Sequence, residues 1–179
     1  MATGIPSIAC IAVIGKENNP LHISTFPPDT RPELQFSLLL SSTLDIFDVR
    51  IAHKVALQDF GLLQAVDERL ACYGWLTNTG VKFVIVVDMA GRPIGADGGD
   101  GRGTAIGMIG LREADLRPAF NALQTAYIKL LMNPFYSPDD HTPTGPDAEP
   151  RSNTHIKSRK FINEINRIGQ RWSPGISTM

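Results

Sequence analysis

The sequence predicts an α/β chain of the α+β type, with a five-stranded antiparallel sheet sandwiched between one long helix and two helices. Residues 8–14 and 81–87 are mostly apolar at successive positions, so both faces of these two strands are expected to be covered. Residues 33–57 instead repeat apolar side chains at three- and four-residue steps, which predicts a helix long enough to cross a sheet. The expected order of elements is β-β-α-β-β-β-α-α.

The first strand is followed by a turn and a returning strand. Asn tolerates unusual backbone angles and Pro fixes its own, so residues 17–20 are expected to form the turn and residues 21–26 the second strand. Pro27, Pro28 and Pro32 then separate this hairpin from the long helix. The apolar stripe of that helix consists of Phe36, Leu40, Leu44, Phe47, Ile51 and Val55.

Three short apolar runs predict a meander of three strands. They cover residues 62–66, 70–77 and 81–88. Residues 67–69 separate the first two runs, and residues 78–80 (Asn-Thr-Gly) separate the last two. Asn and Gly in such a short link favour a tight hairpin, so neighbouring runs are expected to pair as antiparallel strands.

Two further helices are expected in the C-terminal half. The first covers residues 115–132, where Asp115 can cap the helix and Pro118 is tolerated in the first turn. The second covers residues 153–171. Its apolar side consists of Ile156, Phe161, Ile165, Ile168 and Trp172. Both stripes have the helical period, so each helix is expected to pack one side on the sheet.

Two segments contain little that could pack into a core. Residues 91–110 are rich in glycine, and residues 137–152 are polar and contain several prolines. Such compositions are typical of flexible inserts. Apart from these inserts, residues 1–179 are expected to form a single domain, because the chain has the length of one ordinary domain.

Composition excludes several classes of function. The net charge is −1, which disfavours sequence-independent binding to nucleic acid. Cys10 and Cys72 each lie in an apolar run and are expected to be buried thiols of a reducing compartment. No apolar run reaches the ~18 residues of a membrane span, and the run at 8–14 has no basic segment before it. These features predict a cytosolic protein.

No pattern predicts a cofactor, a metal or a catalytic centre. The glycines of residues 95–103 do not have the spacing G-x-G-x-x-G, and no G-K-[ST] follows them. The histidines, which lack the spacing of metal ligands, are His22, His53, His141 and His155. Cys72 lies in a strand with Arg69 as its only nearby basic residue, so a buried thiol is favoured over a nucleophile.

Four blocks of sequence carry a resemblance to a known family. They are residues 10–21 at the first hairpin, 42–48 (Ser-Thr-Leu-Asp-Ile-Phe-Asp) on the long helix, 73–78 with 81–88 in the meander, and 133–136 (Asn-Pro-Phe-Tyr). A weaker match is Ile156-x-Ser158-x-x-Phe161 in the last helix. In this order the blocks resemble the longin fold and, within it, the sedlin-like subunits of the TRAPP (trafficking protein particle) complex, nearest the "subunit two-like" branch.

The resemblance implies a non-catalytic structural or adaptor subunit of a vesicle-tethering complex, in ER-to-Golgi or intra-Golgi transport. It implies other TRAPP subunits as direct partners. A Rab GTPase is implied as an indirect partner, whose guanine-nucleotide exchange the whole complex promotes. It also implies peripheral association with ER or Golgi membranes through the complex. The two inserts leave the expected core fold intact and affect only the surfaces near them.

Asp45, Ile46 and Asp48 on the long helix form the candidate partner interface. Ile46 lies off the main apolar stripe, as do Leu38 and Leu39, and an exposed apolar residue between acids is typical of a protein-binding patch. A solvated edge of an amphipathic helix is the alternative interpretation. The resemblance raises the expectation that Asp45 contacts a partner.

The C-terminal half contains two more segments of interest. Asn133, Pro134, Phe135 and Tyr136 are expected to be structural, ending the preceding helix and packing an aromatic pair. The last helix is basic, and such a helix can lie on an anionic membrane, although a solvated face is favoured because its apolar side is needed by the sheet.

Two other functions remain open. One is a free-standing longin module that binds a SNARE or a small GTPase directly, although such proteins usually carry a SNARE helix or an anchor after the domain. The other is a small enzyme of unknown type, for which the sequence offers no catalytic constellation. Binding to an isolated Rab would favour the longin module. A ligand-dependent thermal shift would favour the enzyme.

Overall fold

The computed structural model describes residues 4–29, 31–52, 61–93, 111–137 and 155–176. Within these ranges the chain forms five strands and three helices in the expected order. The elements are β1 (Gly4–Ile14), β2 (Pro20–Thr25), α1 (Glu33–Ala52), β3 (Gly61–Ala65), β4 (Leu70–Leu76), β5 (Lys82–Pro93), α3 (Glu113–Leu131) and α4 (Arg159–Arg171).

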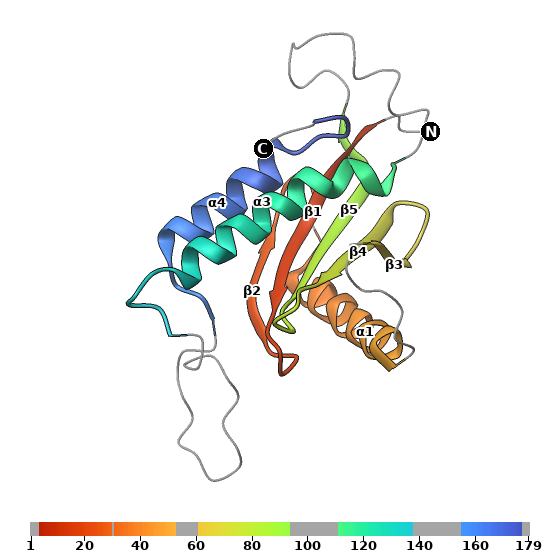
Figure 1. The fold of residues 1–179 in the computed structure, drawn as a ribbon. Helices are drawn as coiled ribbons and strands as arrows, with labels where there is room; N and C mark the ends of the chain where they lie inside the picture. Colours follow the sequence, from red (N-terminus) through yellow and green to blue (C-terminus); the bar gives the residue numbers. More distant parts are fainter. Residues whose placement is uncertain (1–3, 30, 53–60, 94–110, 138–154, 177–179) are drawn as a thin grey trace.

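The strands form one sheet in the order β2-β1-β5-β4-β3, and every neighbouring pair is antiparallel. The first hairpin and the meander meet where β1 pairs with β5 along most of its length. Helix α1 covers one face of the sheet, and α3 and α4 lie side by side on the other (Figure 1). The expected longin-like α+β arrangement is confirmed.

The two central strands are apolar on both faces because each face has its own core. Ile11 of β1 and Ile85 of β5 pack with α3 and α4 in what we call the helix-pair core. Ala12 of β1 and Val84 of β5 pack with α1 in the α1 core. Successive side chains of a strand point to opposite faces, so a run of apolar residues supplies both cores.

Two turns lie at the end of the sheet where β1 ends and β5 begins. Asn18 has a left-handed backbone (φ 61°) in the turn after β1, and Gly80 has φ 84° in the turn before β5. The expected turns at 17–20 and 78–80 are therefore present. Lys82 Nζ donates a hydrogen bond to Asn18 Oδ1 at 2.7 Å, which joins the start of β5 to the first turn.

Strand β5 is longer than predicted. Its last residues pair with the start of β1, Arg92 opposite Ile5 and Pro93 opposite Gly4. Residues 91–93 therefore belong to the sheet and not to a loop, and the rest of the predicted insert, 94–110, lies outside the described residues. The sequence did not indicate this extension because the partner strand is far away in the chain.

Helix α3 begins two residues earlier than predicted, at Glu113. Asp115 is consequently its third residue, and its carboxylate accepts a hydrogen bond from the backbone N–H of Arg112 at 3.0 Å. Pro118 is in the second turn and not in the first, so the helix lacks the hydrogen bond that residue 118 would donate to the carbonyl of Ala114.

Helix α4 begins at Arg159, six residues later than predicted. The backbone N–H of Ile156 donates to the carbonyl of Leu21 at 2.9 Å, so the segment before the helix lies along the edge strand β2. Residues 153–154 lie outside the described part of the chain. The expected apolar side is confirmed, since all five of its residues are buried: Ile156, Phe161, Ile165, Ile168 and Trp172.

The predicted stripe of α1 is confirmed at Phe36, Leu40 and Phe47, which are buried. Thr43 is also fully buried, and its Oγ1 donates to the carbonyl of Leu40 at 2.7 Å. Ile51 was expected in the stripe but is exposed. The predicted end of the helix, 53–57, lies outside the described residues. Among the helices described, none is long and apolar enough to cross a membrane.

Candidate functional site

The side of α1 that points away from the sheet carries apolar residues. Leu34, Leu38, Asp45 and Val49 follow one another at spacings of four and seven residues, so they share one side of the helix. We call these four residues the outer face of α1. Leu34 is 69% exposed, Leu38 65% and Val49 57%. This helix is thus apolar on both sides while the sheet covers only one of them.

Contacts with the edge strand β3 hold α1 in place. Arg50 donates from its guanidinium to the carbonyl of Leu62 at 2.5 Å, and Ser42 Oγ donates to Gln64 Oε1 at 3.2 Å. The N–H of Leu62 donates to the carboxylate of Glu113, at the start of α3, at 3.0 Å. These bonds fix the orientation of α1, so its outer face is presented as a surface of defined shape.

The two acidic residues of the predicted partner interface have different surroundings. Asp45 and Asp48 are both exposed. Burial lowers the pKa of the Lys82 ammonium, while the carboxylates of Asp48 and Glu17 oppose that shift. Asp48 therefore stabilises a buried cation of the fold. For Asp45, no hydrogen bond or ion pair joins its carboxylate to any residue that the structure describes, so its charge is available to a partner.

Ile46 was expected to be exposed, and that prediction is wrong. Its side chain is half-buried and packs against the α1 core. Leu39 is also half-buried there, whereas Leu38 is exposed as expected. The apolar part of the candidate surface is therefore supplied mainly by Leu34 and by Leu38. The predicted stripe of α1 did not include Leu34, because that stripe lies on the buried side of a helix that also carries apolar residues on its exposed side.

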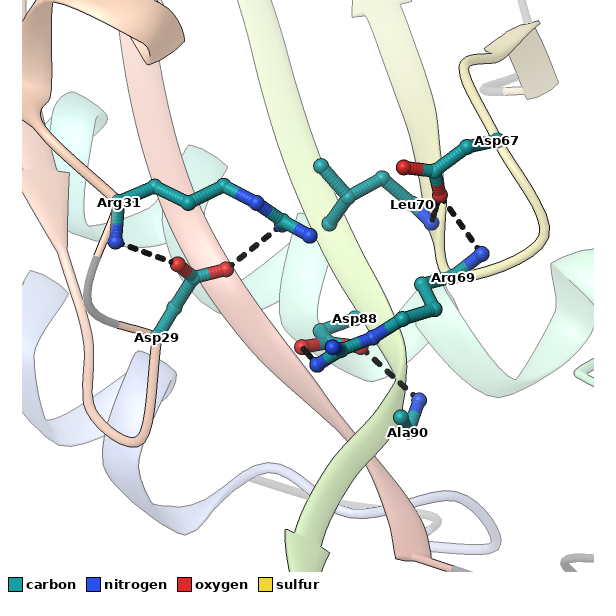
Figure 2. A network of polar contacts seen from close by, with 7 residues as sticks. All are labelled: Asp29, Arg31, Asp67, Arg69, Leu70, Asp88 and Ala90. Carbon is teal, nitrogen blue, oxygen red and sulfur yellow. Dashed lines mark hydrogen bonds and ion pairs between the residues drawn. The ribbon is translucent and has the colours of Figure 1, made fainter. Parts of the chain in front are cut away.

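A network of polar contacts lies at the end of the sheet near the start of α1. Figure 2 shows that its residues come from the connection before α1, the β3–β4 turn and strand β5. Asp29 accepts hydrogen bonds from the backbone N–H and the guanidinium of Arg31, both at 2.9 Å. Asp88 is buried and accepts from Arg69 at 2.8 Å and from the N–H of Ala90 at 2.9 Å.

The carboxylates of this network are committed to structural hydrogen bonds. Asp67 Oδ1 accepts from the backbone N–H of Leu70 at 2.6 Å and of Arg69 at 2.7 Å, and these two donors lower the pKa of the Asp67 carboxyl. The hydrogen bond and the charge of Asp88 raise the pKa of the Arg69 guanidinium. The bond between Arg69 and Asp88 holds the β3–β4 turn against β5. Each of the three carboxylates in the network already has a hydrogen-bond partner.

Cys72 and Cys10 are buried in the α1 core, as expected. Burial raises the pKa of the Cys72 thiol to about 12, and burial is also the largest cause of a raised pKa at Cys10. Neither thiol is thus activated as a nucleophile. In the part of the chain that the structure describes, no three His, Cys, Asp or Glu side chains are grouped as metal ligands.

The Asn133–Tyr136 segment ends α3 but does not pack an aromatic pair. Asn133 Oδ1 accepts from the N–H of Phe135 at 3.1 Å, and the Asn133 carbonyl accepts from the N–H of Tyr136 at 3.0 Å. Tyr136 packs against the helix-pair core, whereas Phe135 is 95% exposed. Only one of the two rings is packed, so the predicted pair is wrong.

The class of protein follows from the fold: the chain is a longin-like α+β module. The family model described as sedlin matches residues 13–171. Over 137 residues the chain is 36% identical to a trafficking protein particle complex subunit 2-like protein of Bos taurus, covering 73% of this chain and 84% of that protein.

Proteins with the same name in two other organisms give similar results. The chain is 36% identical over 165 residues to that of Taeniopygia guttata, covering 89% of this chain and 94% of the relative. The chain is 30% identical over 166 residues to the protein of Dictyostelium discoideum, covering 90% of this chain and 95% of the relative. The chain belongs to the sedlin family.

Proposed function

We propose that this chain is a non-catalytic structural or adaptor subunit of a TRAPP-like vesicle-tethering complex. Membership in the sedlin family and relatives named as TRAPP subunits support this proposal. The observation that carries it is the outer face of α1, where leucines and an aspartate without a described partner lie exposed on a helix fixed to the sheet.

The outer face of α1 supports binding to another subunit for a physical reason. Exposed leucines in one patch remain in water in the isolated chain, and burying the remaining exposed part of each under a partner would contribute about 1–2 kcal/mol. Asp45 lies on the same side and adds a charge that selects a partner with a basic or hydrogen-bond-donating group. In this proposal Asp45 makes the contact, while Ile46 and Asp48 support the helix beneath it.

The wider role follows from this assembly. The chain joins ER or Golgi membranes peripherally, through the complex. It contributes contacts that hold the complex together, and the complex as a whole promotes guanine-nucleotide exchange on a Rab GTPase.

The first test is affinity purification of the tagged chain from its own cells in moderate salt, followed by mass spectrometry. We expect other TRAPP subunits in amounts comparable to the chain itself. Asp45→Tyr should reduce their recovery at least about tenfold, because a bulky ring replaces the charge at the centre of the surface. Asp45→Asn should have a smaller effect, since it keeps the shape.

Glu68→Tyr is the matched control, because it makes the same kind of change at another exposed acid, in the β3–β4 turn. Circular dichroism should confirm that all three variants are folded. Full recovery of TRAPP subunits with Asp45→Tyr would contradict the proposed interface. If no TRAPP subunit is recovered with the unchanged chain, and a SNARE or a small GTPase is recovered instead, the chain is a free-standing longin module.

A further inference from the structure

A second surface lies on the opposite side of the sheet from α1. Helices α3 and α4 are antiparallel, so the end of α3 and the start of α4 lie together, and the turn after α3 projects from the same end (Figure 1). Between them is a cavity of about 670 Å³. This volume is typical of sites that take a small molecule or the side chains of a peptide.

The inner wall of this cavity is apolar. It is lined by Ala126 and Leu130 of α3 and by Phe161 of α4, all of which are buried. Leu130 and Phe161 also belong to the helix-pair core, so the wall is part of the rigid interior and not of a loop. An apolar side chain that enters the cavity would therefore leave water against a preformed surface.

The rim of the cavity is positively charged. Lys129 of α3 and Arg159 and Lys160 of α4 line it, and all three are exposed. None of the three forms a salt bridge with a residue that the structure describes. The acid of the same cavity, Glu164, is already paired with Arg167, whose Nε donates to it at 3.1 Å. The uncompensated charge of the rim is thus positive.

Exposed apolar side chains continue from this rim. Met132, which lines the cavity, is 76% exposed, and the turn that follows it carries the fully exposed ring of Phe135. Exposed apolar side chains beside a charged rim are typical of a surface that binds another molecule.

We propose that the cavity between α3 and α4 binds an acidic segment of a partner protein that also carries aromatic or long aliphatic side chains. The acidic residues would pair with Lys129, Arg159 and Lys160. An apolar side chain between them would enter the cavity beside Met132, and the exposed ring of Phe135 in the following turn would pack on the part of the peptide that stays outside. This site lies on other elements than the outer face of α1, so the chain would have two separate binding surfaces.

The shape of the site favours a peptide over a lipid surface. A membrane contacts what projects from a protein, and the apolar side chains that project at this site are those of Phe135 and Met132. The positive residues, however, surround a hollow with an apolar inner wall, and a flat surface cannot enter it. A peptide uses both features at once, since its charges meet the rim while one of its side chains fills the hollow.

The test uses the full chain labelled with ¹⁵N and a synthetic amidated peptide in which two runs of glutamate flank a Phe-Leu pair. We expect saturable shifts of the amide signals of Leu130, Arg159 and Phe161. Raising NaCl from about 0.1 M to about 0.5 M should weaken binding, because the rim is exposed. A peptide with Ser-Ser in place of the apolar pair should bind at least about tenfold more weakly.

Substitutions locate the site. Arg159→Glu and Phe135→Ala should each weaken binding of the first peptide about tenfold, and both residues are exposed, so the fold should tolerate them. Arg171→Glu is the matched control, since it makes the same charge change in the last turn of α4, and it should leave the affinity within about twofold. Unchanged amide spectra of the β-sheet would confirm that each variant is folded.

Three results would overturn the proposal. One is the absence of saturable shifts at the cavity at peptide concentrations up to about 1 mM, the weak end of transient contacts. Another is equal affinity for the Phe-Leu and Ser-Ser peptides, which would mean attraction by charge alone. The third is binding to phosphatidylserine vesicles, lost with Arg159→Glu and Phe135→Ala, in the absence of peptide binding. That result would assign the patch to a membrane surface.

Discussion

At the scale of single residues, a buried histidine couples the sheet to α4. His22 of β2 shares a hydrogen bond of 2.7 Å between its Nε2 and Ser24 Oγ. Its ring packs edge-on against Phe161, with the ring centroids 5.6 Å apart. Burial, and after it the charge of nearby His155, lower the pKa of His22 below its ordinary value. The neutral ring is therefore the form that the fold prefers.

This preference predicts a loss of stability in mild acid. The unfolded chain takes up a proton at His22 near the ordinary pKa of about 6.5, whereas the folded chain does so only at lower pH. The contribution of His22 is therefore fully present above about pH 6.5 and is lost as the pH falls toward its folded pKa. Chemical unfolding between about pH 7.5 and 5 should show a falling free energy of unfolding.

His22→Gln should make that fall smaller, because glutamine does not titrate in this range. Its stability at neutral pH should also be lower, since the contact with Phe161 is lost. His155→Gln should make the fall only slightly smaller, because it removes the second cause of the lowered His22 pKa and leaves the burial of that ring, the larger cause, in place. If His22→Gln has the same pH dependence as the unchanged chain, another group is responsible.

At the scale of secondary-structure elements, two glycines allow a helix to pack closely against its neighbours. Gly74 of β4 faces α1, and a Cβ atom there would lie 2.6 Å from Phe47 Cζ and also against Leu63. Gly169 of α4 faces Phe26, where a Cβ atom would lie 2.5 Å from Cε1 of the buried ring. Each glycine therefore sets how closely a helix packs on its neighbours.

Gly169→Ala should destabilise the protein by about 1–3 kcal/mol, because the ring of Phe26 is buried and has no room to move. Helix propensity alone predicts the opposite, since alanine is favoured over glycine by about 1 kcal/mol in a helix interior. Thermal and urea unfolding would measure the change. Asn163→Ala, at an exposed position of the same helix, is the control and should be neutral or slightly stabilising. A gain in stability at Gly169→Ala would show that α4 is packed less tightly than described.

At the scale of the whole molecule, the two cores share the same strands. The α1 core and the helix-pair core lie on opposite faces of β1 and β5, and neighbouring residues of these strands supply both. Neither core is formed without the central strand pair. The described structure therefore favours one cooperative unit, and the expectation that residues 1–179 form a single domain remains a prediction.

Leu40→Ala in the α1 core and Leu123→Ala in the helix-pair core should each cost about 2–5 kcal/mol of unfolding free energy. Both variants should still unfold in one transition, with the same midpoint by far-UV circular dichroism and by tryptophan fluorescence. Trp75 and Trp172 both contact the helix-pair core, so fluorescence reports on that face alone. Separate midpoints in Leu40→Ala would show that the α1 core unfolds independently.

The boundaries of elements were predicted less well than the elements themselves. Strand β5 extends to Pro93 because Gly4 and Ile5 pair with its end. Helix α4 starts late because Ile156 forms a hydrogen bond with Leu21 and holds the preceding segment extended. In both cases the deciding partner lies far away in the sequence, so no local pattern contains the information.

The candidate surfaces were predicted in part. Asp45 and Leu38 are exposed as expected, but Ile46 is half-buried and Phe135 is exposed. Spacing along a helix shows which residues share a side, and it does not show how far the sheet reaches around that side. Exposure therefore depends on the angle at which the helix lies on the sheet.

The sequence by itself determined the order of strands and helices and the presence of a core on each face of the sheet. Both follow from the local period of apolar residues, which the backbone geometry converts directly into strands and helices. Only the tertiary structure decided that Leu34 is exposed while Ile46 is half-buried, and that Lys129, Arg159 and Lys160 meet around one cavity. These features bring together residues from different elements, and their positions depend on how those elements pack.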